Sequence, residues 1–72
     1  MNNRQFLAAL GQRIRDFRLE KNMSQTDLAS KCGFGKATMS RLETGKLNST
    51  IGTLKKIANA LKVELSDMFA DL

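Results

Sequence analysis

The segment "LASKCGFGKATMS", residues 28–40, places two glycines around one phenylalanine, between two groups of helix-favouring residues. Glycine adopts the left-handed backbone conformation without a steric penalty, so Gly33 is suited to end one helix. Gly35 is suited to the capping position of the next helix. Because so short a connection fixes the angle between its neighbours, the segment predicts a helix, a tight turn and a second helix.

The helix after this turn is predicted over about residues 36–44, with Gly45 ending it. Residues three or four apart share a helix face, so Met39 and Leu42 are expected to point into the core with Phe34. The opposite face carries two cations, two hydroxyls and one methyl, from Lys36, Ala37, Ser40, Arg41 and Thr44. A face of this kind, without carboxylates or bulky apolar groups, can approach the base edges of B-DNA.

The helix before the turn is predicted to lie across the DNA backbone while its successor enters the major groove. Its amino-terminal N–H groups then face phosphate, favoured by the helix dipole. The loop that follows the second helix supplies further polar groups on the same side. The side chains expected to contact or position the phosphates are Ser24, Gln25, Thr26, Thr44, Lys46, Asn48 and Ser49.

Apolar spacing predicts the remaining helices, and no strand pattern competes with them. Residues 4–21 form the first helix, capped by Asn2 or Asn3. The stretch "SQTD", residues 24–27, is a capping box that opens the second helix. A fourth helix begins at the cap Thr50, and a fifth, short helix carries Leu65, Met68, Phe69 and Leu72. The sequence thus predicts an all-α, compact five-helix domain over residues 1–72.

The charge of the chain is unevenly distributed. Its 12 Lys and Arg residues exceed its 7 Asp and Glu residues, which gives a net charge of +5. Residues 1–62 hold all the basic groups and a net charge of +8, whereas residues 63–72 hold three acids and no base. A basic body predicts a polyanionic partner, and the acidic segment is expected to be kept away from it.

Several classes of function and site are disfavoured by composition. The chain has no His, so His proton relays and His metal ligands are excluded, and no cofactor or metal is expected. The single cysteine, Cys32, cannot form an intrachain disulfide and is expected in the core. No nucleophile–base pair or glycine-rich phosphate loop points to an enzyme. The start shows no signal-like segment and no apolar run is long enough to span a membrane, which predicts a cytoplasmic protein.

Three stretches together resemble the lambda-repressor-like helix-turn-helix family, of the Cro/cI or XRE type. They are "LGQRIRDFRLEKNMSQTDLASKCG", "MSRLETGK" and "LKKIANALKV", and the similarity covers about residues 9–70. The resemblance implies a five-helix fold with its motif at about residues 24–44. It also implies major-groove binding, and a homodimer on a palindromic operator.

The resemblance assigns roles to individual residues. Base reading falls to the positions Lys36, Ala37, Ser40 and Arg41. Gln25 matches a glutamine that contacts phosphate and braces a reading side chain. Glu43 matches a glutamate that pairs with an arginine of the first helix, here Arg18.

The sequence departs from the family pattern at three positions. Gly35 replaces the usual Ser or Thr cap, which removes one side-chain contact to phosphate. Ser49 replaces a frequent proline, and Lys62 replaces the glycine that often ends the fourth helix.

The end of the chain is more apolar than one short terminal helix requires. Leu65 and Phe69 are expected to close the core, and Phe6 suits either the core or a contact with this tail. A two-fold dimer contact within or near residues 63–72 is predicted. Its expected members are Ile51, Val63, Met68 and Leu72.

The sequence therefore predicts a sequence-specific DNA-binding transcriptional regulator, a dimeric repressor that reads a palindromic operator through the major groove. The alternative is an antitoxin-like or other protein-interaction module whose main partner is a protein.

Overall fold

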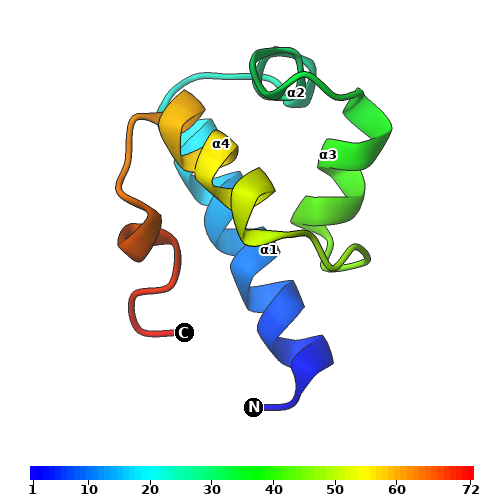
Figure 1. Ribbon diagram of the computed structural model, residues 1–72, viewed down its shortest axis with the longest axis vertical. Helices are drawn as coiled ribbons and strands as arrows, with labels where there is room; N and C mark the ends of the chain where they lie inside the picture. The colour runs from blue at the N-terminus through cyan, green and yellow to red at the C-terminus, as the bar shows by residue number, and fades with distance from the viewer.

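The computed structural model describes residues 1–72 and contains four α-helices and no strand. They are followed by one short 3-10 helix, and Figure 1 shows their arrangement around the long first helix. Their bounds are α1 (Asn3–Glu20), α2 (Gln25–Cys32), α3 (Lys36–Glu43), α4 (Ile51–Leu61) and η1 (Leu65–Met68). The all-α prediction is confirmed. None of the helices is long and apolar enough to cross a membrane.

The predicted fifth α-helix is wrong. Residues 65–68 form a single 3-10 turn, and at its start the backbone N–H of Glu64 donates to Oδ2 of Asp67 at 2.9 Å. The turn is capped at Phe69, and Asp71 has a left-handed backbone, with φ at 61°, so the helix does not extend to the end of the sequence. A short segment that must turn back over α1 satisfies its backbone with 3-10 bonds, which suit runs of a few residues.

The predicted caps of α1, α2 and α4 are confirmed. The side chains of Asn2, Ser24 and Thr50 each accept a hydrogen bond from the backbone N–H three residues later. In α2 the box is reciprocal, because the backbone N–H of Ser24 donates to Asp27 at 3.0 Å. This bond holds the pKa of the Asp27 carboxyl below its ordinary value. The stabilisation is therefore present at neutral pH and is lost as pH falls through the lowered pKa.

A residue with a left-handed backbone directly follows each of the four α-helices or lies two residues after its end, and for α3 this residue is Gly45, with φ at 74°. Gly33 has φ at 78° after α2, as predicted, and Asn22 has φ at 58° two residues after α1. Lys62 caps α4 with φ at 59°, a conformation that favours glycine. The cost of the left-handed lysine is about 1–2 kcal/mol, by the usual penalty for an L-residue.

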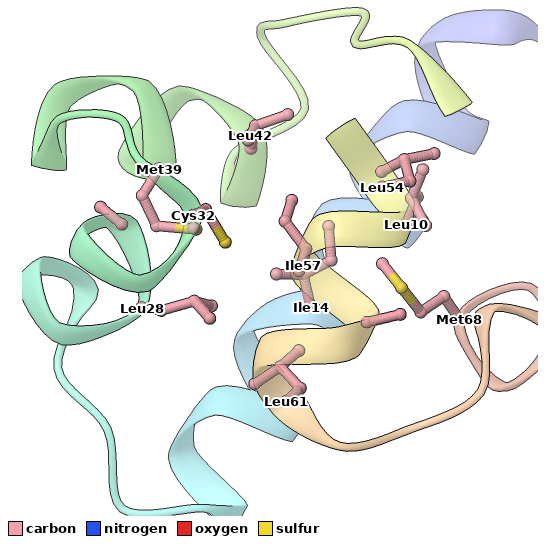
Figure 2. Close-up of a cluster of buried hydrophobic side chains, with 12 residues drawn as sticks. Leu10, Ile14, Leu28, Cys32, Met39, Leu42, Leu54, Ile57, Leu61 and Met68 are labelled. Carbon is pink, nitrogen blue, oxygen red and sulfur yellow. The ribbon is translucent and has the colours of Figure 1, made fainter. Parts of the chain in front are cut away.

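The core is one cluster of buried apolar side chains to which every element contributes (Figure 2). Met39 and Leu42 of α3 face this cluster, as predicted, and Phe34 packs against it from the turn. Cys32 lies in the same cluster and is buried, as predicted. Burial raises the pKa of its thiol.

The end of the chain packs on α1. Met68 is fully buried in the core, so the prediction that it forms a dimer contact is wrong: its side chain is already covered within one chain. The ring of Phe69 stacks on Phe6, with ring centroids 6.3 Å apart. Arg13 donates to the carbonyl oxygens of Asp67 and Ala70, at 2.7 Å each. These contacts hold the last turn of the chain against α1.

Two glycines allow α1 to run directly against the carboxyl end of α3. A Cβ on Gly11 would lie 2.4 Å from the carbonyl oxygen of Leu42 and 2.6 Å from that of Glu43. A Cβ on Gly45 would lie 2.7 Å from the backbone of Ala8, and its φ of 74° also favours glycine. Because backbone atoms stand in the way, no side-chain rotation could relieve either contact. The close approach therefore requires glycine on both sides.

Replacing Gly11 by Ala should lower the free energy of unfolding by about 1–3 kcal/mol, because the new methyl group forces α1 and α3 apart. Gly52→Ala is the matched control. It adds the same methyl group inside α4, where the nearest atom lies 3.8 Å away. This control should gain about 0.5–1 kcal/mol through helix propensity. Urea unfolding of both variants measures the difference, and equal stabilities would contradict the close approach.

Candidate nucleic-acid interface

The turn between α2 and α3 sets how the two helices face one another. The backbone N–H groups of Gly33 and Phe34 donate to the carbonyl oxygens of Ser30 and Ala29, at 3.2 and 3.0 Å. Gly35 then enters α3 with extended backbone and no side-chain cap. Neither Gly33 nor Gly35 has a neighbour within 4 Å of where a Cβ would stand. Only Gly33, with its positive φ, therefore requires glycine.

The outer face of α3 is exposed, polar and positively charged. Lys36, Ala37 and Arg41 are exposed, and Ser40 is half-buried beside them. Neither cation forms an ion pair, because the one salt bridge of the chain joins Arg18 and Glu43. Thr44 directs its hydroxyl to the carbonyl oxygen of Ser40 at 2.9 Å. The structure thus brings the predicted base-reading residues together on one accessible surface, with both positive charges free.

The residues predicted to contact phosphates at α2 lie at its amino end. The hydroxyl oxygen of Ser24 accepts from the backbone of Asp27 at 2.9 Å, which leaves its own hydrogen free to donate. Thr26 is exposed. Gln25 is half-buried, and its Nε2 donates to Oε1 of Glu43 at 3.1 Å. One of the two amide hydrogens of Gln25 therefore remains available.

Of the three residues predicted to contact phosphates in the loop after α3, two are exposed and one has a buried hydroxyl. Lys46 and Asn48 are exposed. The hydroxyl of Ser49 is buried and has no hydrogen-bond partner. It borders an apolar cavity rather than solvent, so a phosphate contact from Ser49 is not compatible with this structure.

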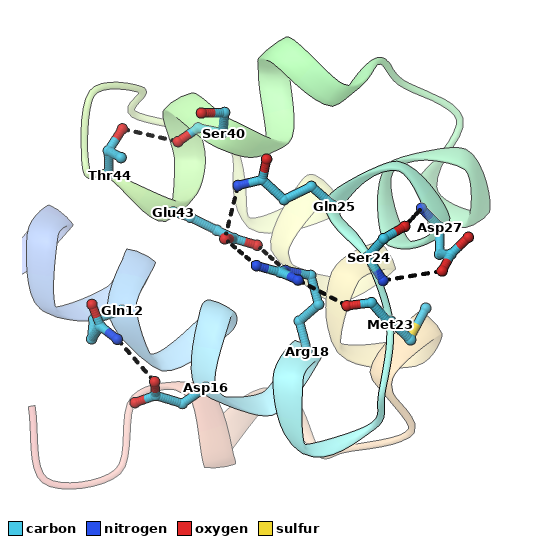
Figure 3. Close-up of polar contacts among 10 residues, drawn as sticks. All are labelled: Gln12, Asp16, Arg18, Met23, Ser24, Gln25, Asp27, Ser40, Glu43 and Thr44. Carbon is cyan, nitrogen blue, oxygen red and sulfur yellow. Dashed lines mark hydrogen bonds and ion pairs between the residues drawn. The ribbon is translucent and has the colours of Figure 1, made fainter.

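A buried ion pair lies behind this surface (Figure 3). Arg18 Nε lies 2.6 Å from Oε2 of Glu43, and its Nη2 lies 3.0 Å from Oε1. Arg18 is 7% exposed and Glu43 is 5% exposed. The hydrogen bond to Glu43 raises the pKa of Arg18, outweighing the opposite effect of burial. The planar guanidinium and the carboxylate thus meet in a two-bond, charge-assisted arrangement.

Two further hydrogen bonds complete the network. Nη1 of Arg18 donates to the carbonyl oxygen of Met23 at 2.8 Å, and Gln25 donates to Glu43. The network therefore joins α1, the loop before α2, the first residue of α2 and the last residue of α3. Gln25 braces the glutamate behind the outer face and has no bond to a side chain of that face.

The structural roles of Arg13 and Gly11 could not be predicted from the sequence patterns. Arg13 appears in the sequence as one of several charged residues on the solvent side of α1, yet it binds carbonyl groups 54 and 57 residues away. Gly11 lies inside a helix-favouring run, and the only local signal is a glycine where alanine would favour the helix. Neither distant partner is visible in local spacing.

Comparisons with known proteins agree with this arrangement. The HTH_3 family profile, described as "Helix-turn-helix", matches residues 14–68. Control protein C.BamHI of Bacillus amyloliquefaciens is 39% identical over 59 residues, which are 81% of this chain and 73% of that protein.

Two solved structures are similar over most of the chain. The restriction-modification controller protein C.AhdI from Aeromonas hydrophila superimposes with a TM-score of 0.91 at 30% identity, covering 96% of this chain and 100% of that one. SinR, a master regulator for biofilm formation solved in complex with DNA, gives 0.78 at 34% identity, covering 83% of this chain and 97% of that one.

Removing one partner of the buried pair should be far more harmful than removing both. Arg18→Ala leaves the Glu43 carboxylate buried without a cation and should lower the free energy of unfolding by about 3–5 kcal/mol. The double variant Arg18→Met, Glu43→Leu removes both charges and should lose clearly less. Urea unfolding followed by circular dichroism measures both. A double variant as unstable as the single one would contradict this view of the pair.

Proposed function

Because the chain belongs to the HTH_3 helix-turn-helix family, we propose that it is a transcriptional regulator that binds double-stranded DNA by placing α3 in the major groove. The observation that carries this proposal is the outer face of α3, which is small, polar and positively charged. Its two cations are free of ion pairs, and the only acid of α3 is buried behind the face against Arg18. The face therefore offers hydrogen-bond donors without a carboxylate that would repel DNA.

The four base-reading residues have complementary chemistry. Arg41 and Lys36 donate to guanine O6 and N7, Ser40 bonds either a donor or an acceptor, and the methyl of Ala37 contacts thymine. Their accessibility on one helix face supports assigning sequence recognition to them.

The phosphate contacts are proposed on both sides of α3. Ser24, Gln25 and Thr26 would contact one stretch of backbone at the start of α2. Lys46 and Asn48, with Thr44, would contact another at the end of α3. Ser49 is left out because its hydroxyl is buried. The acidic segment after α4 lies across the molecule from α3, where it does not oppose DNA (Figure 1).

A homodimer on a palindromic operator is the proposed binding form. Ile51 is 62% exposed and lies on the lining of an apolar cavity of about 150 Å³. A two-fold contact brings the same patch of both subunits together. The Ile51 side chain of each subunit would then enter the cavity beside Ile51 of the other. Val63 and Leu72 are half-buried and would lie at the edge of the contact. Two reading helices about 34 Å apart would then meet successive turns of DNA.

Repression is the proposed outcome of binding, since a dimer on its operator occupies DNA that other proteins need. No catalytic step is part of this proposal, and the chain has no cluster of three or more potential metal-ligating His, Cys, Asp or Glu side chains.

Selection of bound sequences from random duplex DNA tests the readout. Arg41→Ala should cost about 1–3 kcal/mol of binding free energy per half-site and relax the preference at one position in each half-site. Lys46→Ala, a proposed phosphate contact, should instead weaken binding to all sequences alike. If the wild-type chain enriches no sequence, specific readout is refuted, and a protein partner becomes the better explanation of the exposed face.

The dimer is tested with two matched substitutions on exposed apolar residues. Ile51→Lys should give a monomer in sedimentation, because a buried ammonium would replace the side chain that fills the partner's cavity. Leu19→Lys is the control, since Leu19 is 52% exposed at the far end of α1. Identical sedimentation of the two variants would refute the proposed contact.

A further inference from the structure

A polar hollow lies beside the buried ion pair, between α1 and the facing ends of α2 and α3. It has a volume of about 400 Å³ and opens to solvent through exposed side chains of α1 and Thr44. Its lining consists of Ala8, Gln12, Arg15, Arg18, Gln25, Glu43 and Thr44. None of the predicted roles described above includes Gln12 or Arg15.

The hollow carries one uncompensated positive charge. Arg18 and Glu43 form its inner wall and neutralise each other. Arg15 is exposed and forms no salt bridge or hydrogen bond. The adjacent carboxylate, Asp16, lies outside the lining and accepts a hydrogen bond from Gln12 at 2.9 Å. An anion that enters the hollow therefore meets a guanidinium that breaks no existing bond to receive it.

Two members of the lining already belong to the proposed DNA surface. Gln25 begins α2 and keeps one amide hydrogen free, while Thr44 follows α3 directly. Figure 3 shows Gln25 bonded to Glu43 of the ion pair, and Thr44 bonded to Ser40 at the end of α3. The hollow is thus continuous with the surface that α3 presents.

We propose that this hollow receives a backbone phosphate of the duplex that α3 reads, with Arg15 as its charge partner. The inference rests on the proposed function and extends the DNA contacts onto α1. A phosphodiester carries one negative charge and two free oxygens, which match the single free guanidinium in charge and in its fork of parallel donors. Arg15 thereby positions the duplex and reads no base.

Salt-dependent binding separates this role from others. For wild type and Arg15→Ala, the dissociation constant is measured against salt concentration on the selected operator and on an unrelated duplex. The substitution removes one phosphate contact from each protomer, so the slope of log affinity against log salt should fall by about 0.9 per protomer, or about 1.8 for the proposed dimer. Both duplexes should lose affinity by the same factor, so the preference for the operator stays unchanged. Arg15→Lys should restore most of the slope, because it keeps the charge.

Lys56→Ala is the matched control, since it also removes one exposed positive charge. Lys56 lies on α4 beside Lys31 and Lys62, in a different hollow of the surface. It should leave the slope unchanged, which excludes a general effect of net charge. Circular dichroism of each variant establishes that the fold is retained.

The outcomes distinguish this inference from the function on which it rests. A wild-type chain that binds no duplex overturns the proposed function and this inference with it. A wild-type chain that binds, while Arg15→Ala keeps the wild-type slope, overturns the Arg15 contact alone. Relaxed preference at one operator position in Arg15→Ala would also overturn it, because that result belongs to a base contact.

Discussion

The buried ion pair between Arg18 and Glu43 holds α3 in place. Arg18 and Glu43 are almost fully buried, and each is held by two hydrogen bonds between them and one to a neighbour. Such a pair gives little net stability compared with an apolar pair, but its geometry is strict, because a displaced partner would leave a buried charge unsatisfied. Since Glu43 is the last residue of α3, the pair fixes the carboxyl end of this helix.

The opposite end of α3 is fixed by backbone geometry. Gly33 turns the chain in the left-handed region, and α3 begins three residues later. At the same carboxyl end, the carbonyl oxygens of Leu42 and Glu43 approach α1 at Gly11 with no room for a side chain. The helix is therefore restrained by the turn at its start, and by the ion pair and this backbone contact at its end. Its outer face carries no part of this restraint, which leaves those side chains free for recognition.

Local patterns were sufficient to predict most of the fold. The caps Ser24 and Thr50, the left-handed Gly33 and the inward Met39 all follow from short-range spacing, and all are present. The prediction of a fifth α-helix was wrong because, in so short a segment, the spacing of apolar residues does not distinguish an α-helix from a 3-10 helix.

Long-range contacts lay beyond those patterns. Met68 was assigned to a dimer contact because it is apolar. Apolar character alone does not say whether the same chain or a partner chain covers a residue. Ser49 was assigned to phosphate because loop hydroxyls are usually exposed, whereas this one faces an apolar cavity. Arg13 and Arg15 looked alike in sequence, yet only Arg13 finds carbonyl partners, and these come from the far end of the chain.

The single thiol, Cys32, has a use of its own. Because it is buried and its pKa is raised, alkylating reagents should reach it when the structure around α2 opens, locally or globally, so the rate of its labelling should measure that opening without any added probe.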